Sequence, residues 1–420
     1  AAIDLGAAGV FSFEDDGPKA QLAGERPSLG SVAVDESLAA LGGAYTDGAA
    51  SATLSASLVQ AQFNSVYGAD GAGSTVYSLA LNTNGEPSVG SGLFAVDPLV
   101  AGGKGAEIQL SQVGNVITGS VGGSPYFTLT INPNTGAVTL ELKDNIWHGN
   151  TASHDDAQSL LLGSGVLQLV QTLTDGDGDK ASAAIDLGAA GVFSFEDDGP
   201  DITGEVAMLI LDDEGQSSAV NPGPDAAGIV GGPGDDAGVL YELQGDFDFA
   251  AGADGLKAFE ITGLTANGSP LQAINVNTTT GQGTVESVNV TWTQNGADAG
   301  GTYIGVGAIS GHTIFTLVVT ASGHYTFTLL ESLAHPATHD GDAQNGVETE
   351  WEDNLSLVFG VKITDQDNDS DTATLTINVD DDTLDVAPMA LSDLTGINQT
   401  VSAALGLAPG ADGWKGVTFD

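Results

Sequence analysis

Apolar and polar residues alternate one by one over many short stretches of this chain. The alternation is clear in residues 373–379 (ATLTINV), 287–293 (SVNVTWT) and 324–330 (HYTFTLL). A period of two places every second side chain on one face, so each stretch predicts a half-buried β-strand. Only residues 53–66 (TLSASLVQAQFNSV) show a weak helical pattern. The pattern therefore predicts an all-β protein.

Two longer stretches have the pattern of β-hairpins. Residues 126–142 read YFTLTINPNTGAVTLEL, and residues 314–330 read IFTLVVTASGHYTFTLL. In each, two alternating runs flank a group of turn-forming residues, NPNTG or ASG. Many strands that each have one apolar face bury those faces best when two sheets pack together, so we expect β-sandwich domains.

The chain also repeats itself over long distances. Residues 183–200 are identical to residues 1–18, and Gly-Ala-Asp-Gly occurs at 68–71, 252–255 and 410–413. A repeat of this length indicates whole domains in tandem. We therefore predict the last strand of a preceding repeat at 1–18, full β-sandwich repeats at 19–200 and 201–388, and the start of a third repeat at 389–420.

The charge of the chain limits its partners. It has 56 Asp and Glu against 8 Lys and Arg, a formal net charge of −48. Such a surface repels nucleic acid and anionic lipid and attracts cations. No apolar run is long enough for a transmembrane helix, so we expect no direct membrane insertion. The absence of Cys fits a protein secreted by a bacterium, and equally a cytosolic one.

Clustered aspartates are the candidate chemistry. The motif D-x-D-x-D follows a predicted strand at 175–179 and again at 365–369. It departs from an EF-hand, because the sixth loop position is Lys180 or Ser370 rather than Gly, and a strand follows instead of a helix. Crowded carboxylates repel one another unless a cation lies between them, and numerous protein oxygens favour Ca²⁺. Ordinary Asp-Gly turns with solvated charge are the alternative.

The predicted calcium ligands come from these loops, from the acidic strand ends at the repeat boundaries, and from acidic pairs early in each repeat. They are Asp15, Asp16, Asp35, Glu36, Asp175, Asp177, Asp179, Asp197, Asp198, Asp213, Glu214, Asp365, Asp367, Asp369, Asp371, Asp380, Asp381 and Asp382.

Other candidate residues are less favoured. Asp70, Asp254 and Asp412 lie in Gly-Ala-Asp-Gly, which also fits a simple turn. His148 and His335 follow the two hairpins, where a structural role in a loop is favoured over zinc. The chain has neither H-E-x-x-H nor G-x-S-x-G, so no catalytic residue is assigned and we do not expect an enzyme.

Two segments together resemble a known family. They are TLTDGDGDKASAAIDL…EDDGP and GHYTFTLLESLAHP…LVFGVKITDQDNDSDTATLTINVDDD. They are similar to the tandem repeats of giant bacterial adhesins exported by type I secretion, the repeats-in-toxin (RTX) adhesins with VCBS-type and related β-sandwich repeats. The repeats here, at about 180–190 residues, are longer than is usual in that family.

The resemblance implies immunoglobulin-like or cadherin-like sandwiches chained end to end, with Ca²⁺ stiffening the linkers. It implies an extracellular extender at the surface of a Gram-negative cell, which holds a distal binding module for adhesion and biofilm formation. The expected partners are neighbouring repeats of a monomeric chain. The alternative is a calcium-dependent module of the same adhesin that binds a host or biofilm glycan or protein.

Overall fold

The structure is a computed structural model of the 420-residue chain. It describes residues 5, 7, 9–12, 14–43, 48–203, 210–212, 242–277, 279–295, 299–335, 355–380, 385–386, 407–408 and 415.

The chain divides into two compact units. Unit 1 contains Ala1–Pro200, Ala251–Gly255 and Asp365–Asp369. Unit 2 contains Asp201–Ala250, Leu256–Thr364 and Ser370–Asp420. Unit 1 therefore includes two short segments from later in the sequence, and both matter for the site described below.

Unit 1 is built on a six-stranded sheet in the order β2-β8-β7-β6-β5-β4. Its central strands are joined by antiparallel hairpins, because neighbours in sequence pair directly. The strands are β2 (Ser51–Leu54), β4 (Val89–Val96), β5 (Lys104–Val113), β6 (Val116–Val121), β7 (Ser124–Ile131) and β8 (Val138–Leu142).

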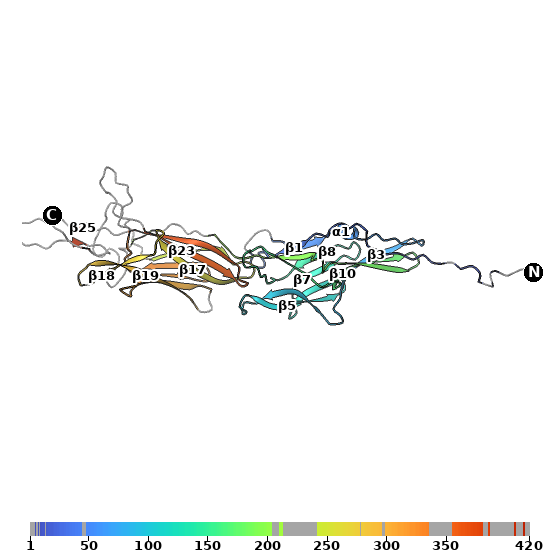
Figure 1. The fold of residues 1–420 in the computed structure, drawn as a ribbon, viewed down its shortest axis with the longest axis horizontal. Helices are drawn as coiled ribbons and strands as arrows, with labels where there is room; N and C mark the ends of the chain where they lie inside the picture. Colours follow the sequence, from blue (N-terminus) through green and yellow to red (C-terminus); the bar gives the residue numbers. More distant parts are fainter. Residues whose placement is uncertain are drawn as a thin grey trace, which may run out of the picture. The chain divides into compact units, whose positions relative to one another are not determined.

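Two three-stranded sheets face this sheet in unit 1. One has the order β11-β10-β3, and in the other β12 pairs in parallel with β1 and antiparallel with β9. The elements are β1 (Val32–Asp35), β3 (Ala72–Leu81), β9 (Ala157–Ser159), β10 (Leu167–Asp175), β11 (Lys180–Asp186), β12 (Phe193–Glu196) and the short helix α1 (Ala56–Gln60). Figure 1 shows β3 and β10 side by side.

The core of unit 1 lies between these layers. Phe127 of β7 packs on Phe195 of β12 with ring centroids 4.8 Å apart, and both side chains are fully buried. Leu129 of β7 and Leu169 of β10 belong to the same buried cluster. Burying one such side chain contributes about 1.5–3 kcal/mol, so contacts across the layers are the main source of stability.

Unit 2 repeats this arrangement with different residues. Its six-stranded sheet has the order β15-β22-β21-β20-β19-β18, and its second sheet has the order β14-β24-β23-β17. β14 pairs in parallel with β24, as β1 does with β12. The larger strands are β15 (Glu242–Asp246), β17 (Leu256–Ala266), β18 (Gln272–Val276), β19 (Gly283–Gln294), β20 (Gly301–Gly307), β21 (Thr313–Val319), β22 (His324–Leu329), β23 (Leu355–Asp365) and β24 (Ser370–Asp380).

Short strands complete unit 2. They are β13 (Asp201–Thr203), β14 (Ile210–Asp212), β16 (Asp248–Ala250), β25 (Asp385–Val386) and β26 (Leu407–Ala408). The core between the sheets is rich in aromatic rings; Phe315 stacks on Phe327 at 5.5 Å between centroids, and Phe359 of β23 meets both edge-on. Figure 1 shows β23, β17 and β19 within this unit.

The predicted fold class, all-β with tandem sandwich domains, is confirmed. Both predicted hairpins form, as β7–β8 and β21–β22. The weak helical pattern yields only α1, and among the described residues no helix is long or apolar enough to cross a membrane. The exact repeat boundaries stay a prediction.

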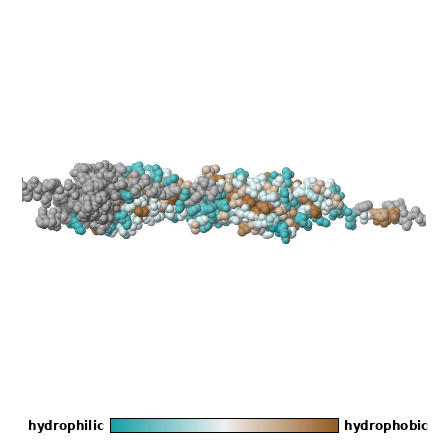
Figure 2. All heavy atoms as spheres, turned by 90° about the horizontal axis from the view of Figure 1, so that it is seen from above, coloured by the Kyte–Doolittle hydropathy of each residue, from teal (hydrophilic) through white to brown (hydrophobic). Residues whose placement is uncertain are grey.

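The duplicated segment has two different structures. In residues 183–200 it contributes the end of β11 and all of β12, whereas the described part of residues 1–18 contains no strand. Phe193 is 1% exposed in its sheet, but its counterpart Phe11 is 72% exposed. Figure 2 shows hydrophobic atoms at this N-terminal end of the chain. In residues 183–200 the segment is buried because β1 and β9 pair with β12.

This difference predicts unequal effects of two matched substitutions. Phe193→Ala should lower the free energy of unfolding of unit 1 by about 3–5 kcal/mol, because it leaves a cavity in the core. Phe11→Ala removes the same atoms from the identical sequence and should change it by less than about 0.5 kcal/mol. Denaturant unfolding followed by fluorescence measures both, and equal effects of the two substitutions would contradict the structure.

Candidate metal centre

Two acidic loops of identical geometry follow the hairpin strands of the second layer. In the first acidic loop (residues 175–179), between β10 and β11, Oδ1 of Asp175 accepts hydrogen bonds from the N–H groups of Gly178 and Asp179 at 3.0 and 2.8 Å. Gly178 has φ of 109°, the left-handed region that glycine reaches without strain. Oδ1 of Asp175 is thus used by the N–H groups of the loop, whereas Oδ2 is buried without a hydrogen-bond partner.

The second acidic loop (residues 365–369), between β23 and β24, repeats these contacts. Oδ1 of Asp365 accepts from the N–H groups of Asn368 and Asp369 at 3.1 and 2.8 Å, and Asn368 has φ of 88°. Oδ2 of Asp365 is again buried and unpartnered. Asn tolerates the left-handed conformation better than most residues, so it substitutes for the glycine of the first loop.

Each loop meets two further aspartates. The first acidic cluster consists of Asp15, Asp70, Asp175, Asp177 and Asp179; carboxylate oxygens of Asp15, Asp177 and Asp179 lie within 4.8 Å of one another, as do those of Asp70, Asp175 and Asp177. Apart from Asp175, these side chains are exposed. Contact with Asp15 raises the pKa of Asp70 and Asp179, and contact with Asp175 raises that of Asp177.

The second acidic cluster, all in unit 1, is the equivalent arrangement with Asp197, Asp254, Asp365, Asp367 and Asp369. Oxygens of Asp197, Asp254 and Asp367 lie within 4.8 Å of one another. Asp197 occupies the same place in its duplicated segment as Asp15, and Asp254 the same place in Gly-Ala-Asp-Gly as Asp70. The repeat therefore builds the same group of carboxylates twice.

The Gly-Ala-Asp-Gly motif positions one aspartate of each cluster, Asp70 in the first and Asp254 in the second. Gly68 and Gly252 have φ of 82° and 79°. A Cβ on Gly68 would overlap the carbonyl oxygen of Asp16, and one on Gly252 would overlap that of Asp198. Ala253 also donates its N–H to the carbonyl of Asp198 at 3.0 Å. The motif is thus more than a turn: its glycine lets the backbone approach closely enough to deliver Asp70 or Asp254.

Two further side chains extend the second acidic cluster. Glu36, directly after β1, is 0% exposed, and its Oε1 accepts from the N–H of Ile146 at 2.8 Å. The N–H of His148 donates to Oδ2 of Asp367 at 3.2 Å. The His148 ring lies between two acids, with Nε2 3.8 Å from Oε1 of Glu36 and Nδ1 3.7 Å from Oδ2 of Asp156.

Burial makes this cluster electrostatically unfavourable when no cation is bound. Burial, together with repulsion from neighbouring carboxylates, raises the pKa of Asp197 and of Asp254 to about 9, that of Asp365 to about 10 and that of Asp369 to about 6. Burial likewise raises the pKa of Glu36. Several carboxylate oxygens have no hydrogen-bond partner: Glu36 Oε2, Asp197 Oδ2, Asp254 Oδ1 and Oδ2, Asp365 Oδ2 and Asp369 Oδ2.

The negative charge of the neighbouring carboxylates also shifts the pKa of His148. Burial alone would lower its pKa, but the carboxylates of Asp156 and Glu36 outweigh that effect and raise the pKa to about 11. The free oxygens and the crowded negative charge together fit a hard divalent cation, since Ca²⁺ takes six to eight oxygen ligands at about 2.3–2.6 Å.

The structure sorts the predicted ligands. It brings Glu36, Asp15, Asp197 and both acidic loops into the clusters. Other predicted ligands are held elsewhere: Asp35 accepts from the N–H of Ser37, and Asp371 from those of Ile202 and Thr372. Asp16 lies 3.9 Å from Lys19, and Asp198 contributes the carbonyl noted above. Asp213, Glu214, Asp381, Asp382 and the side chain of Asp380 lie outside the described residues.

From the sequence, Asp70 and Asp254 ranked below the other acids and a structural role was favoured over zinc for His148, whereas the structure brings all three side chains to the acidic clusters. The signal for the aspartates was present, because Gly-Ala-Asp-Gly recurs at the same point of each repeat. Nothing local marks His148, which reaches the cluster only because the segment after β8 lies against the second acidic loop.

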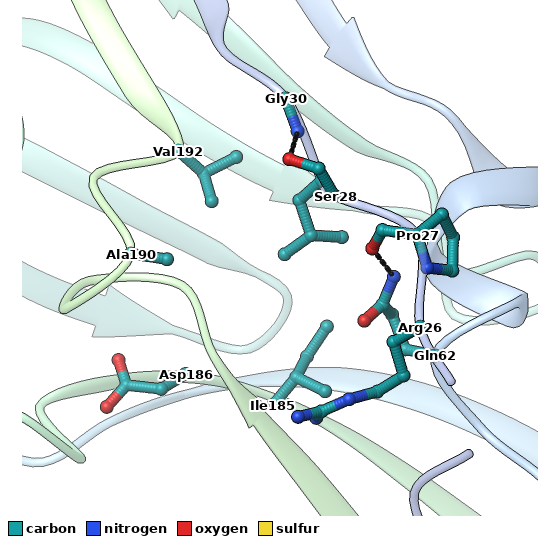
Figure 3. Close-up of a pocket in the computed structure, with 10 residues that line it drawn as sticks. Arg26, Pro27, Ser28, Gly30, Gln62, Ile185, Asp186, Ala190 and Val192 are labelled. Atoms are coloured by element: carbon teal, nitrogen blue, oxygen red, sulfur yellow. Dashed lines mark hydrogen bonds between the residues drawn. The ribbon is translucent and has the colours of Figure 1, made fainter. Parts of the chain in front are cut away.

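An open pocket of about 560 Å³ in unit 1 is a separate feature. It is lined by the only arginine of the chain, Arg26, and by Asp186, but these two side chains do not meet (Figure 3). Asp186 instead accepts hydrogen bonds from the N–H groups of Ala189 and Gly165, which lower its pKa although burial acts to raise it. The pocket therefore lacks a paired acid and base.

Several solved structures with detectable similarity to the chain are cadherin ectodomains. A protocadherin gammaB7 EC3-6 structure aligns over 95% of this chain and 62% of its own, with 10% identity and a TM-score of 0.20. For Drosophila N-cadherin EC1-4 the shares are 86% and 49%, with 11% identity and a TM-score of 0.19. The chain thus spans about half to two thirds of these structures. At such scores the alignments carry no argument about fold or function.

No curated protein matches the chain. One family model does, described as a domain of unknown function (DUF5801), and it matches residues 31–188 and 234–378. These two matches lie largely in units 1 and 2 and together cover more than half of the sequence. The chain therefore belongs to the DUF5801 family and carries its domain twice.

Proposed function

We propose that this chain is a calcium-stiffened extender of a bacterial cell-surface adhesin, and that the acidic clusters bind the Ca²⁺ ions. The observation that carries the proposal is the duplication of the cluster. The same loop, the same duplicated segment and the same Gly-Ala-Asp-Gly motif converge twice on a group of carboxylates. A duplicated structural site is what a chain of repeated domains needs at each repeat.

The connectivity of the second acidic cluster supports a stiffening role. The acidic loop 365–369 and residues 251–255 are part of unit 1, yet along the chain they continue directly into β24 and β17 of unit 2. A cation bound to Asp197, Asp254 and Asp367 would hold these segments together. Without it, repulsion among the carboxylates opposes their association. Bound Ca²⁺ would therefore restrict the motion of these chain segments relative to one another.

The rest of the proposal concerns context. Export by type I secretion, an RTX-class parent protein, a Gram-negative cell surface and a role in adhesion and biofilm formation rest on the resemblance of the sequence motifs. The chain acts without a reaction of its own in this proposal. Its partners are the neighbouring repeats of the same chain, and the chain is a monomer.

Calcium removal is the direct test. We expect EGTA to lower the melting temperature and to change the maximum dimension measured by small-angle X-ray scattering, with both effects reversed by excess Ca²⁺ and not by Mg²⁺. Binding to the native state alone stabilises by about 2.7 kcal/mol when the free ion is at 100 times its Kd. The proposal would be refuted if EGTA changed neither the melting temperature nor the maximum dimension.

The second test uses one substitution in the cluster. Asp365→Asn keeps an oxygen for the two loop N–H groups but removes a carboxyl group whose ionisation is opposed by burial and by the neighbouring acids. We expect it to raise the melting temperature in EGTA and to reduce the further increase that Ca²⁺ produces. Asp186→Asn is the matched control, because Asp186 also accepts from the N–H of a residue three positions later, Ala189 at 2.9 Å, and belongs to neither cluster. Equal responses of the two variants to Ca²⁺ would exclude Asp365 as a ligand.

The pKa shifts predict a dependence of stability on pH. The raised pKa values of Asp197 and Asp365 mean that the folded state binds more protons than the unfolded state between about pH 4 and pH 9. The raised pKa of His148 acts in the same direction, since its contribution is lost as the pH rises toward about 11. In EGTA the melting temperature should therefore fall from about pH 5 to about pH 8.

Bound Ca²⁺ should weaken this dependence, because the ion stabilises the ionised carboxylates. Thermal melts in a pH series with EGTA or with Ca²⁺ measure the difference. A melting temperature in EGTA that rises over this pH range would contradict the shifted pKa values.

A further inference from the structure

One part of the second acidic cluster has a nitrogen donor. His148 Nε2 or Nδ1 and carboxylate oxygens of Glu36 and Asp197 lie within 4.8 Å of one another. We propose that Glu36, His148 and Asp197 form a second metal site, which binds a divalent transition-metal ion such as Zn²⁺ beside the calcium ligands. The site is distinct from calcium stiffening, and it remains if the acidic clusters bind no Ca²⁺.

All three side chains are buried and have atoms free for a ligand. Glu36, His148 and Asp197 are 0%, 1% and 3% exposed. Glu36 Oε2, Asp197 Oδ2 and both ring nitrogens of His148 have no hydrogen-bond partner. Buried polar atoms normally find partners, so a histidine placed only for packing would be expected to hydrogen-bond at least one nitrogen. One possible ligand atom from each of the three side chains lies within 4.8 Å of the other two.

The backbone holds each of these residues in place. Oε1 of Glu36 accepts from the N–H of Ile146 at 2.8 Å, and Oδ1 of Asp197 accepts from the N–H of Asp198 at 2.8 Å. The backbone N–H of His148 donates a hydrogen bond to Oδ2 of Asp367. Each carboxylate thus has one oxygen fixed and the other free, which is the preorganisation that a metal site requires.

Asp156 supplies the outer partner typical of a metal-bound histidine. A ligating imidazole usually donates its second N–H to a carboxylate, which orients the ring. Oδ2 of Asp156 lies 3.7 Å from Nδ1 of His148, while Glu36 lies on the Nε2 side at 3.8 Å. Asp156 therefore lies on the Nδ1 side of the His148 ring, and the metal would lie on the Nε2 side, between His148 and Glu36. On binding, the metal takes the place of the imidazolium proton, because a ligating histidine is neutral.

The donor set selects the class of ion. Ca²⁺ and Mg²⁺ take oxygen ligands, whereas imidazole favours Zn²⁺ and related transition metals. Asp197, Asp254 and Asp367 form an oxygen-only group, so the two sets divide the cluster by chemistry and share Asp197. The first acidic cluster groups only aspartates among the described residues. We therefore place the transition metal in the second cluster alone.

Zinc titration in saturating Ca²⁺ tests the assignment. With the 420-residue chain depleted of metal, isothermal titration calorimetry should show a Zn²⁺-binding event that His148→Gln removes. His324→Gln is the matched control, because His324 is an exposed histidine that also lies beside an acid, Asp246 at 2.8 Å. Co²⁺ in place of Zn²⁺ should give visible absorption bands in the control and lose them in His148→Gln. Equal Zn²⁺ binding by the two variants would overturn the proposal.

A second variant covers the case in which His148→Gln unfolds. Asp156→Asn leaves all three ligands in place and alters only the partner of the ring, so Zn²⁺ affinity should fall by about 10–100-fold. The increase in melting temperature with Ca²⁺ should stay as in the wild type, which separates a failure of this site from a failure of the calcium proposal. Unchanged Zn²⁺ affinity in Asp156→Asn would count against the site.

Discussion

Repulsion among buried carboxylates is the constraint on which the rest of this structure depends. In the second acidic cluster, residues from distant parts of the sequence converge where little water is present to screen them, and the pKa values of Asp197 and Asp365 rise far above the usual range. The hydrophobic core of unit 1 holds two of these groups in place, because Val34, Phe193 and Phe195 bury the strands β1 and β12, which end next to Glu36 and Asp197. A bound cation would offset the repulsion among these carboxylates.

The two clusters show how one motif serves in two environments. The acidic loops have the same hydrogen bonds, and Asp15 and Asp70 stand where Asp197 and Asp254 stand in the other copy. The copies differ because only the second receives Glu36 and His148, and because its acids are buried. The second cluster thus has a nitrogen donor beside its carboxylate oxygens, whereas the described residues of the first cluster offer carboxylate oxygens alone.

Much of this could be inferred from the sequence. Alternating runs such as residues 373–379 predicted strands, because alternation of apolar and polar residues places all apolar side chains on one face of a sheet. The loops at 175–179 and 365–369 were predicted as cation ligands from their spacing. Asp371 looks equivalent to those acids in sequence, but backbone N–H groups already use both of its carboxylate oxygens. Spacing along the chain does not reveal which oxygens are left free.

The duplicated segment separates what sequence determined from what tertiary structure decided. The alternating pattern and acidic spacing specified strands, hairpins and loops of carboxylates, because these depend on local geometry. Identical letters nevertheless give β12 with Phe193 buried in one place and an exposed Phe11 in the other. Pairing with β1 and β9 buries the second copy. The tertiary structure likewise brought Asp254 and His148 to the acids, because burial and convergence arise from contacts between residues that are far apart in the chain.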